Sequence, residues 1–142
     1  MIKHQFKIVL NAARNKVWNS LWQIDNYRNW TSAFSEGSDV KTDWQEGSEI
    51  IFHNGKGNGM YSIIEKMKEP SIMTFKHLGE IKNNERQKEG SWSGAKESYI
   101  LSEEGDKTQL IIEMDMDEEW KDYFLKTWPV ALEKIKTIAE SN

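Results

Sequence analysis

The 142-residue chain contains no cysteine and no long hydrophobic run, and both absences limit what it can do. Without cysteine it forms no disulfide, no thiolate metal site and no nucleophilic thiol. The first ten residues alternate polar and apolar side chains instead of forming the apolar core of a signal peptide. No stretch is long enough to cross a bilayer. We therefore expect a soluble, cytoplasmic protein that does not insert into membranes.

The chain also lacks a cluster of basic residues. It has 19 lysines and arginines against 23 acidic residues, with a net charge of −4. Nucleic-acid binding requires a clustered basic face, so we exclude nucleic acid as a partner. The three histidines, His4, His53 and His77, show no short ligand spacing. We therefore expect no metal ion and no cofactor.

Motifs for covalent or phosphate chemistry are missing as well. The glycine-rich stretch 55–59 lacks the Gly-Lys-Ser/Thr ending of a phosphate loop and joins two predicted strands. Ser93 and Ser98 have no histidine and aspartate nearby and no nucleophile elbow. The sequence thus gives no support for nucleophilic catalysis.

Large apolar side chains are abundant, and they are ordered near the C-terminus. Seven tryptophans and six methionines can fill a core or line a hollow one. Near the end of the chain, apolar residues recur every four or three positions, which is the spacing of one helix face: Trp120, Phe124, Trp128, Leu132 and Ile135. This pattern predicts a long amphipathic helix over 117–140, capped by Asp117.

The rest of the chain predicts mainly antiparallel strands. A strand over 6–10 precedes a helix from about Arg14 and a short helix capped by Asp25, which carries Tyr27, Trp30 and Phe34. Glycines between 48–54 and 60–67 indicate a hairpin, and a second one joins 99–102 to 109–116. The polar stretch 79–94 is interpreted as an exposed loop. We expect a single α+β domain over residues 1–142.

Several local signatures, in order along the chain, resemble one superfamily. They are residues 12–30 near the start, Gly59-Met60-Tyr61, Glu69-Pro70, residues 97–101, residues 105–110 and the final helix segment 127–140. Together they resemble the START-like, or SRPBCC, superfamily. Within it, the chain is most similar to the branch named after the activator of the heat-shock-protein ATPase.

This resemblance implies the helix-grip fold. In that fold a curved antiparallel sheet wraps a long C-terminal helix, and two short helices lie between the first two strands. Members that bind ligands hold them in a cavity between the sheet and the last helix, so the resemblance implies a cavity here. The same scaffold carries transport, cyclisation, hydrolysis and co-chaperone roles, and therefore the fold alone does not fix the activity.

Eleven residues are the candidates for contact with a ligand. They are the aromatic and polar side chains expected to face the space between sheet and last helix: Trp30, Phe34, Phe52, Phe75, His77, Glu97, Tyr99, Met114, Trp120, Phe124 and Trp128. Leu101, Ile112 and Leu132 are expected beside them. Any one of these rings can instead fill a solid core.

Two polar candidates have competing interpretations. Glu97 shares strand parity with Tyr99 and Leu101, which directs it inward, but it can also sit near a sheet end and reach water. His77 shares parity with Phe75 and can orient a ligand or act as a general base. A histidine with satisfied hydrogen bonds is the structural alternative.

The preferred hypothesis is a non-enzymatic protein that binds a hydrophobic or amphipathic small molecule. One alternative is a protein-interaction module that regulates a chaperone ATPase, although a second domain to grip such a partner is not expected. The other is an enzyme acting on a hydrophobic substrate, with Glu97 or His77 as acid or base. A monomer is the default, and a dimer stays open.

Overall fold

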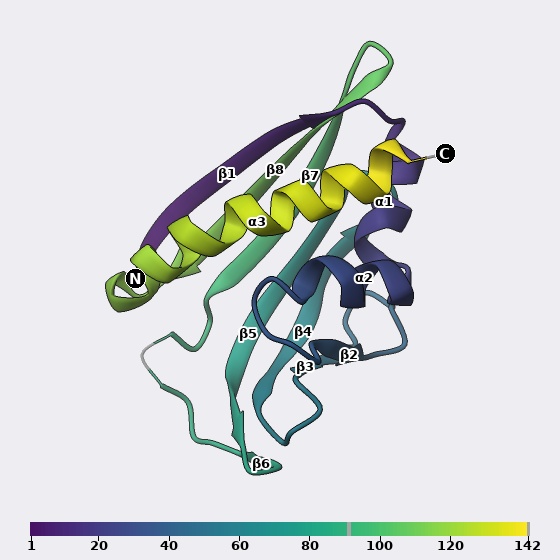
Figure 1. Cartoon of the computed structure of the whole chain (residues 1–142). Coiled ribbons are helices and arrows are strands. Elements are labelled where there is room, and N and C mark those ends of the chain that lie inside the picture. Colours follow the sequence, from purple (N-terminus) through teal and green to yellow (C-terminus); the bar gives the residue numbers. More distant parts are fainter. Residues whose placement is uncertain (91, 142) are drawn as a thin grey trace.

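A curved antiparallel sheet and a long C-terminal helix form the body of the molecule (Figure 1). The computed structural model describes residues 1–90 and 92–141. Its elements are β1 (Ile2–Leu10), α1 (Arg14–Trp22), α2 (Ile24–Thr31), β2 (Asp39–Lys41), β3 (Glu49–His53), β4 (Gly59–Lys68), β5 (Ile72–Lys82), β6 (Glu85–Arg86), β7 (Lys96–Glu104), β8 (Lys107–Met116), the 3₁₀ turn η1 (Glu118–Trp120) and α3 (Lys121–Glu140).

The strands follow the order β1-β8-β7-β5-β4-β3-β2, and the short β6 pairs with β5. Every neighbouring pair is antiparallel. The helices α1 and α2 lie between β1 and β2 in the chain, and α3 runs diagonally across the sheet (Figure 1). This arrangement confirms the predicted helix-grip fold.

Side-chain alternation explains which face of each strand meets α3. On β8, Leu110, Ile112, Met114 and Met116 are buried, whereas Glu113 and Asp115 between them are partly exposed. The buried side of α3 carries Trp128, Ala131, Leu132, Ile135 and Ala139, as the predicted stripe requires. Strand and helix periods therefore direct their apolar faces into one shared core.

The predicted loop over 79–94 is wrong in its first part. Strand β5 continues to Lys82, and the chain turns back through Asn83 and Asn84 into β6. Both asparagines have positive φ, at 52° and 65°, as a tight two-residue hairpin turn requires. Asparagine tolerates this conformation, so the pair is a hairpin signal that the charged composition of the stretch conceals.

The start of α2 also differs from the prediction. The N-cap is Gln23, whose side-chain oxygen accepts a hydrogen bond of 3.0 Å from the backbone N–H of Asn26. Asp25 lies in the first turn, where a carboxylate still complements the helix dipole. The helix ends at Thr31, so Phe34 belongs to the turn that follows it. None of the helices in the described ranges is long and apolar enough to span a membrane.

Candidate functional site

A cavity of about 470 Å³ lies between the sheet, α2 and the beginning of α3. Its walls come from elements far apart in the sequence: the end of α1, α2 and the turn after it, strands β3, β4, β5, β7 and β8, and the segment through η1 into α3. The lining is mostly apolar, and the volume falls in the range of roughly 300–1,000 Å³ usual for small-molecule sites.

All eleven candidate residues from the sequence line this cavity. From the helices and their flanking turns come Trp30, Phe34, Trp120, Phe124 and Trp128, and from the strands Phe52, Phe75, His77, Glu97, Tyr99 and Met114. Leu101, Ile112 and Leu132 pack in the core without reaching the cavity wall. The structure thus brings the candidates together, and their contact with a ligand stays a prediction.

Trp128 is the central ring of the wall. It is 2% exposed, and its ring lies 4.8 Å from Phe34, 5.9 Å from Trp30 and 6.2 Å from Tyr99, measured between centroids. Its indole N–H donates to the sulfur of Met114 at 2.9 Å. Because one indole contacts α2, β7 and β8 together, it fixes the distance between α3 and the rest of the wall.

Trp120 does not pack as the helical stripe predicted. It is 50% exposed and belongs to η1, not to α3. A 3₁₀ turn rotates each residue further than an α-helix does, so Trp120 leaves the face shared by Phe124 and Trp128. It lies 6.0 Å from the ring of the partly exposed Tyr123 and lines the outer part of the cavity.

A chain of hydrogen bonds crosses three strands on the cavity floor. Ser62 Oγ lies 2.7 Å from His77 Nδ1, and His77 Nε2 lies 3.1 Å from Glu97 Oε1. The Tyr99 hydroxyl donates to the other oxygen of Glu97. Since a carboxylate only accepts, the N–H at Nε2 of His77 donates to Glu97. This places Glu97 inward and gives both ring nitrogens of His77 a partner.

The order serine, histidine, glutamate resembles a nucleophilic triad, but the serine hydroxyl is not accessible from the cavity. Ser62 is fully buried and does not line the cavity, whereas His77 and Glu97 do. A substrate in the cavity would therefore meet the histidine and glutamate without reaching the hydroxyl. The chain of hydrogen bonds fixes the orientation of His77 and Glu97.

The hydroxyl groups of Tyr27 and Tyr99 lie in this same buried region. Burial raises the pKa of both phenols above its usual value, and the carboxylate of Glu97 raises it further. A hydrogen bond from the Ser38 hydroxyl to the Tyr27 oxygen lowers the pKa of Tyr27 by less than burial raises it. Both tyrosines therefore stay protonated in the folded protein at a pH where an unfolded tyrosine ionises.

This difference predicts a loss of stability at alkaline pH. Above about pH 10 the unfolded chain loses the two phenolic protons that the folded chain retains, so the free energy of unfolding falls by about 1.4 kcal/mol per pH unit for each tyrosine. The contribution is complete below pH 10 and is lost as the pH rises. Urea unfolding between pH 8 and 11 measures it, and Tyr27→Phe is expected to lower the slope by about 1.4 kcal/mol per pH unit. An unchanged slope in that variant contradicts the assignment.

Several residues of the wall were missed by the sequence analysis. They include Trp22, Tyr27, Met60, Trp92, Ala95 and Tyr123. Trp22 and Tyr27 carried a signal, because each lies on the buried face of a predicted helix. Trp92 falls in the stretch 79–94 interpreted as an exposed loop, and Ala95 directly follows that stretch; no pattern marked either residue. The indole N–H of Trp22 is buried without a hydrogen-bond acceptor among the described residues.

Within residues 1–90 and 92–141, no three histidine, aspartate or glutamate side chains are grouped as metal ligands would be. On the cavity floor, the chemical groups are aromatic rings, the phenols of Tyr27 and Tyr99, the imidazole of His77 and the carboxylate of Glu97. These groups can bind and orient a molecule, and they can exchange protons with it.

Solved structures share this fold at low sequence identity. The Aha1 dimer from Colwellia psychrerythraea has a TM-score of 0.77 and 20% identity, over 99% of this chain and 97% of that one. CalU16 from Micromonospora echinospora has a TM-score of 0.69 and 18% identity, over 97% and 76%. Protein MLL2253 from Mesorhizobium loti has a TM-score of 0.76 and 10% identity, over 96% of both chains. No curated protein matches the chain at a significant level.

A family model gives the assignment that these identities are too low to give. It is described as activator of Hsp90 ATPase homolog 1-like protein, and it matches residues 11–140. The match runs from the residue after β1 to the last residue of α3, and so it includes every wall of the cavity. The resemblance inferred from the sequence is confirmed: the chain belongs to the family of activator of Hsp90 ATPase homolog 1-like proteins.

Proposed function

We propose that this protein binds a small hydrophobic or amphipathic molecule in the cavity between the sheet and α3. The observation that carries the proposal is a space of about 470 Å³ walled by aromatic rings, with one polar group of side chains on its floor. Apolar walls with a few convergent polar groups are typical of small-molecule sites. The aromatic rings supply affinity because apolar surface of the ligand is removed from water when it packs against them. His77, Glu97 and Tyr99 orient the polar end of the molecule.

A neutral fluorescent probe tests this proposal. N-phenyl-1-naphthylamine gains fluorescence in apolar surroundings, and we expect saturable binding with one site per chain. Trp128→Phe removes part of the cavity wall and is expected to weaken binding at least about threefold, the effect of losing roughly one buried CH₂ group of contact.

Trp18→Phe is the matched control. Trp18 is also buried, but it lies outside the cavity wall, so this variant is expected to bind the probe as the natural protein does. The absence of saturable binding by the natural protein would contradict the proposal. Equal weakening in both variants would show that loss of packing, and not loss of the wall, changes the affinity.

Regulation of a chaperone ATPase is a second candidate. The family description names an activator of the Hsp90 ATPase, and large apolar side chains are exposed on η1 and α3: Trp120, Tyr123, Leu125 and Val130. Exposed apolar groups of this kind are available for protein contact. A higher rate of ATP hydrolysis by Hsp90 from the same organism would support this role. An unchanged rate of ATP hydrolysis in the presence of an excess of this protein would exclude this role.

A further inference from the structure

The charges in the cavity wall are of one sign. Four acidic residues contribute atoms to the lining, namely Glu80, Glu97, Asp115 and Asp117, whereas no lysine or arginine does so anywhere in residues 1–90 and 92–141. The carboxylates of Glu80 and Asp115 lie 3.6 Å from Lys82 and 3.9 Å from Lys3, so the mostly buried Glu97 is the carboxylate that matters for a ligand in the cavity. A wall that accepted fatty acids or phosphate esters would need a cationic side chain to offset the ligand's charge on burial. This wall offers an anion no such partner.

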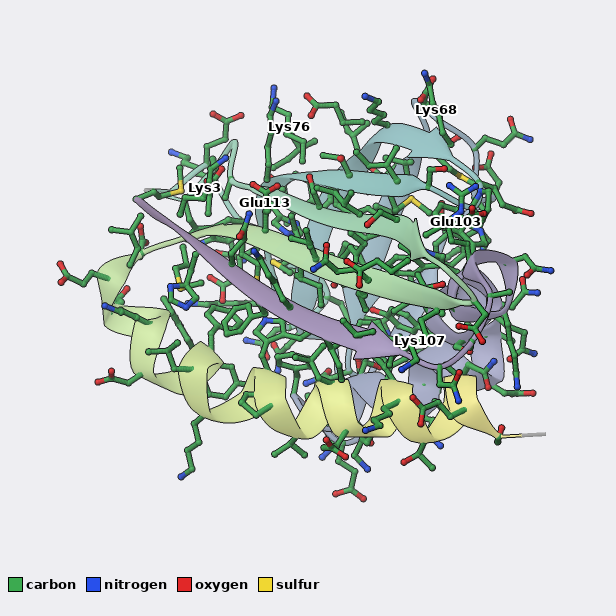
Figure 2. All side chains as sticks on the ribbon, turned by 90° about the horizontal axis from the view of Figure 1, so that it is seen from above. Lys3, Lys68, Lys76, Glu103, Lys107 and Glu113 are labelled. Atoms are coloured by element: carbon green, nitrogen blue, oxygen red, sulfur yellow. The ribbon has the colours of Figure 1, made fainter. Side chains whose placement is uncertain are left out.

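Lysines of four strands lie on the other side of the sheet. Figure 2 shows Lys68 and Lys76 projecting from the sheet away from α3. On the same outer face, Lys96 Nζ is 3.1 Å from Glu65 Oε2 and Lys3 Nζ is 3.9 Å from Asp115 Oδ1. The lysines and arginines of the described residues thus stay outside the cavity lining, even though the net charge of the chain is only −4.

The hydrogen-bond donors next to Glu97 are already in use. His77 Nε2 and the Tyr99 hydroxyl both point to its carboxylate. A ligand carboxylate placed beside Glu97 would have to break these bonds to accept from either donor. Glu97, by contrast, has about four acceptor positions and uses two of them, so it retains capacity for a donor from the cavity. Its side chain is 14% exposed.

Aromatic rings pack around Tyr99, whose hydroxyl is bonded to this carboxylate. The ring of Tyr99 lies 4.8 Å from Trp22, 6.1 Å from Phe75 and 6.2 Å from both Trp30 and Trp128. The face of an aromatic ring attracts a cation, and tryptophan does so most strongly. A mostly buried carboxylate within an aromatic wall therefore suits an organic ammonium group.

We infer that the ligand is an amphipathic organic cation, a protonated amine carried on an apolar or aromatic body. This inference rests on the proposed function, because it names the class of molecule that the same cavity takes. The ammonium group donates to Glu97 and lies against the surrounding rings, and the apolar body fills the space beneath α3. The negative charge at Glu97 is the same one that raises the pKa of Tyr27 and Tyr99.

Three probes with one body and different head groups test the inference. They are 1-naphthylmethylamine, 1-naphthylmethanol and 1-naphthoate, titrated into the protein at pH 7 by calorimetry. The amine is protonated at this pH and the acid is ionised. We expect the amine to bind tightest and the carboxylate weakest, with dissociation constants that differ at least about tenfold, the effect of one charge-assisted hydrogen bond.

Glu97→Gln tests whether Glu97 causes the difference in affinity between the amine and the carboxylate. It preserves the shape of the side chain and removes its charge, and we expect the ratio between carboxylate and amine to fall below about threefold. Glu113→Gln is the matched control, since it makes the same change on the outer face of β8 and is expected to leave the ratio intact. If Glu97→Gln does not fold, the order measured on the natural protein still decides the inference.

The outcomes separate the two proposals. Equal affinities for the three probes, or tightest binding of the carboxylate, overturn the inference and leave the cavity a binding site. Binding by none of the three overturns the proposed function, and the inference with it. A ratio that survives in a folded Glu97→Gln protein shows that the charge of Glu97 does not select the ligand.

Discussion

Replacing Trp128 with alanine is expected to lower the free energy of unfolding by about 3–5 kcal/mol. The indole is 2% exposed and contacts α2, β7 and β8 from the middle of α3. Its removal leaves a void next to the existing cavity, so the neighbouring rings of Phe34 and Trp30 lose contacts that nothing replaces. Urea unfolding followed by far-UV circular dichroism measures the change.

Trp120→Ala is the matched control for this prediction. Trp120 is 50% exposed and belongs to η1, so its loss is expected to change the free energy of unfolding by less than about 1 kcal/mol. Similar losses of stability in the two variants would contradict the assignment of Trp128 as the central ring of the wall.

Gly59→Ala is the second change expected to have a large effect, a loss of about 3 kcal/mol. Gly59 opens β4 and pairs with His53 across the hairpin. A methyl group at this position would lie 2.8 Å from the Cα of His53 and closer still to the carbonyl oxygen of Phe52. Both atoms belong to the backbone, so no side-chain rotation relieves the clash and the two strands must move apart.

Gly90→Ala serves as the control for this prediction. A methyl group there would meet no atom of the described residues beyond its chain neighbours within 4 Å, and Gly90 does not require a positive φ. We expect its unfolding midpoint in urea to match that of the natural protein. A Gly59→Ala protein as stable as the Gly90→Ala protein would show that the hairpin tolerates the side chain.

The elements with a clear period were predictable from the sequence. The stripe on α3 and the alternation on β8 each repeat over many residues, and both directed the same side chains inward that the structure buries. The candidate ligand residues followed from this periodicity and from the family resemblance, which is why all eleven lie on one cavity wall.

The parts that failed depend on single residues or on partners far away in the chain. The turn through Asn83 and Asn84 requires positive φ at both asparagines. In the sequence, these two residues are the only indication of the turn within a charged stretch. The exposure of Trp120 depends on a 3₁₀ turn whose residues have no distinctive pattern. Local composition cannot resolve either feature.

The polar floor of the cavity shows the same limit. Strand parity alone allowed Glu97 to point inward, but the partners that make this position favourable come from β4 and β5. Ser62 lies opposite His77 because of the register of the β4–β5 pair, which includes an irregularity next to Ser62. Such a register is a property of the assembled sheet and cannot be read from one strand.

The central claim, that the cavity admits a small molecule, is tested most directly by NMR of the tryptophan indole groups. We would record ¹⁵N–¹H spectra while adding 1-naphthylmethanol, a neutral probe whose binding does not depend on the charge of Glu97. We predict large, saturable shifts for the indole signals of Trp22, Trp30 and Trp128, which line the cavity, and small ones for Trp18 and Trp44, which do not. Unchanged spectra, or equal shifts for all five, would contradict this prediction.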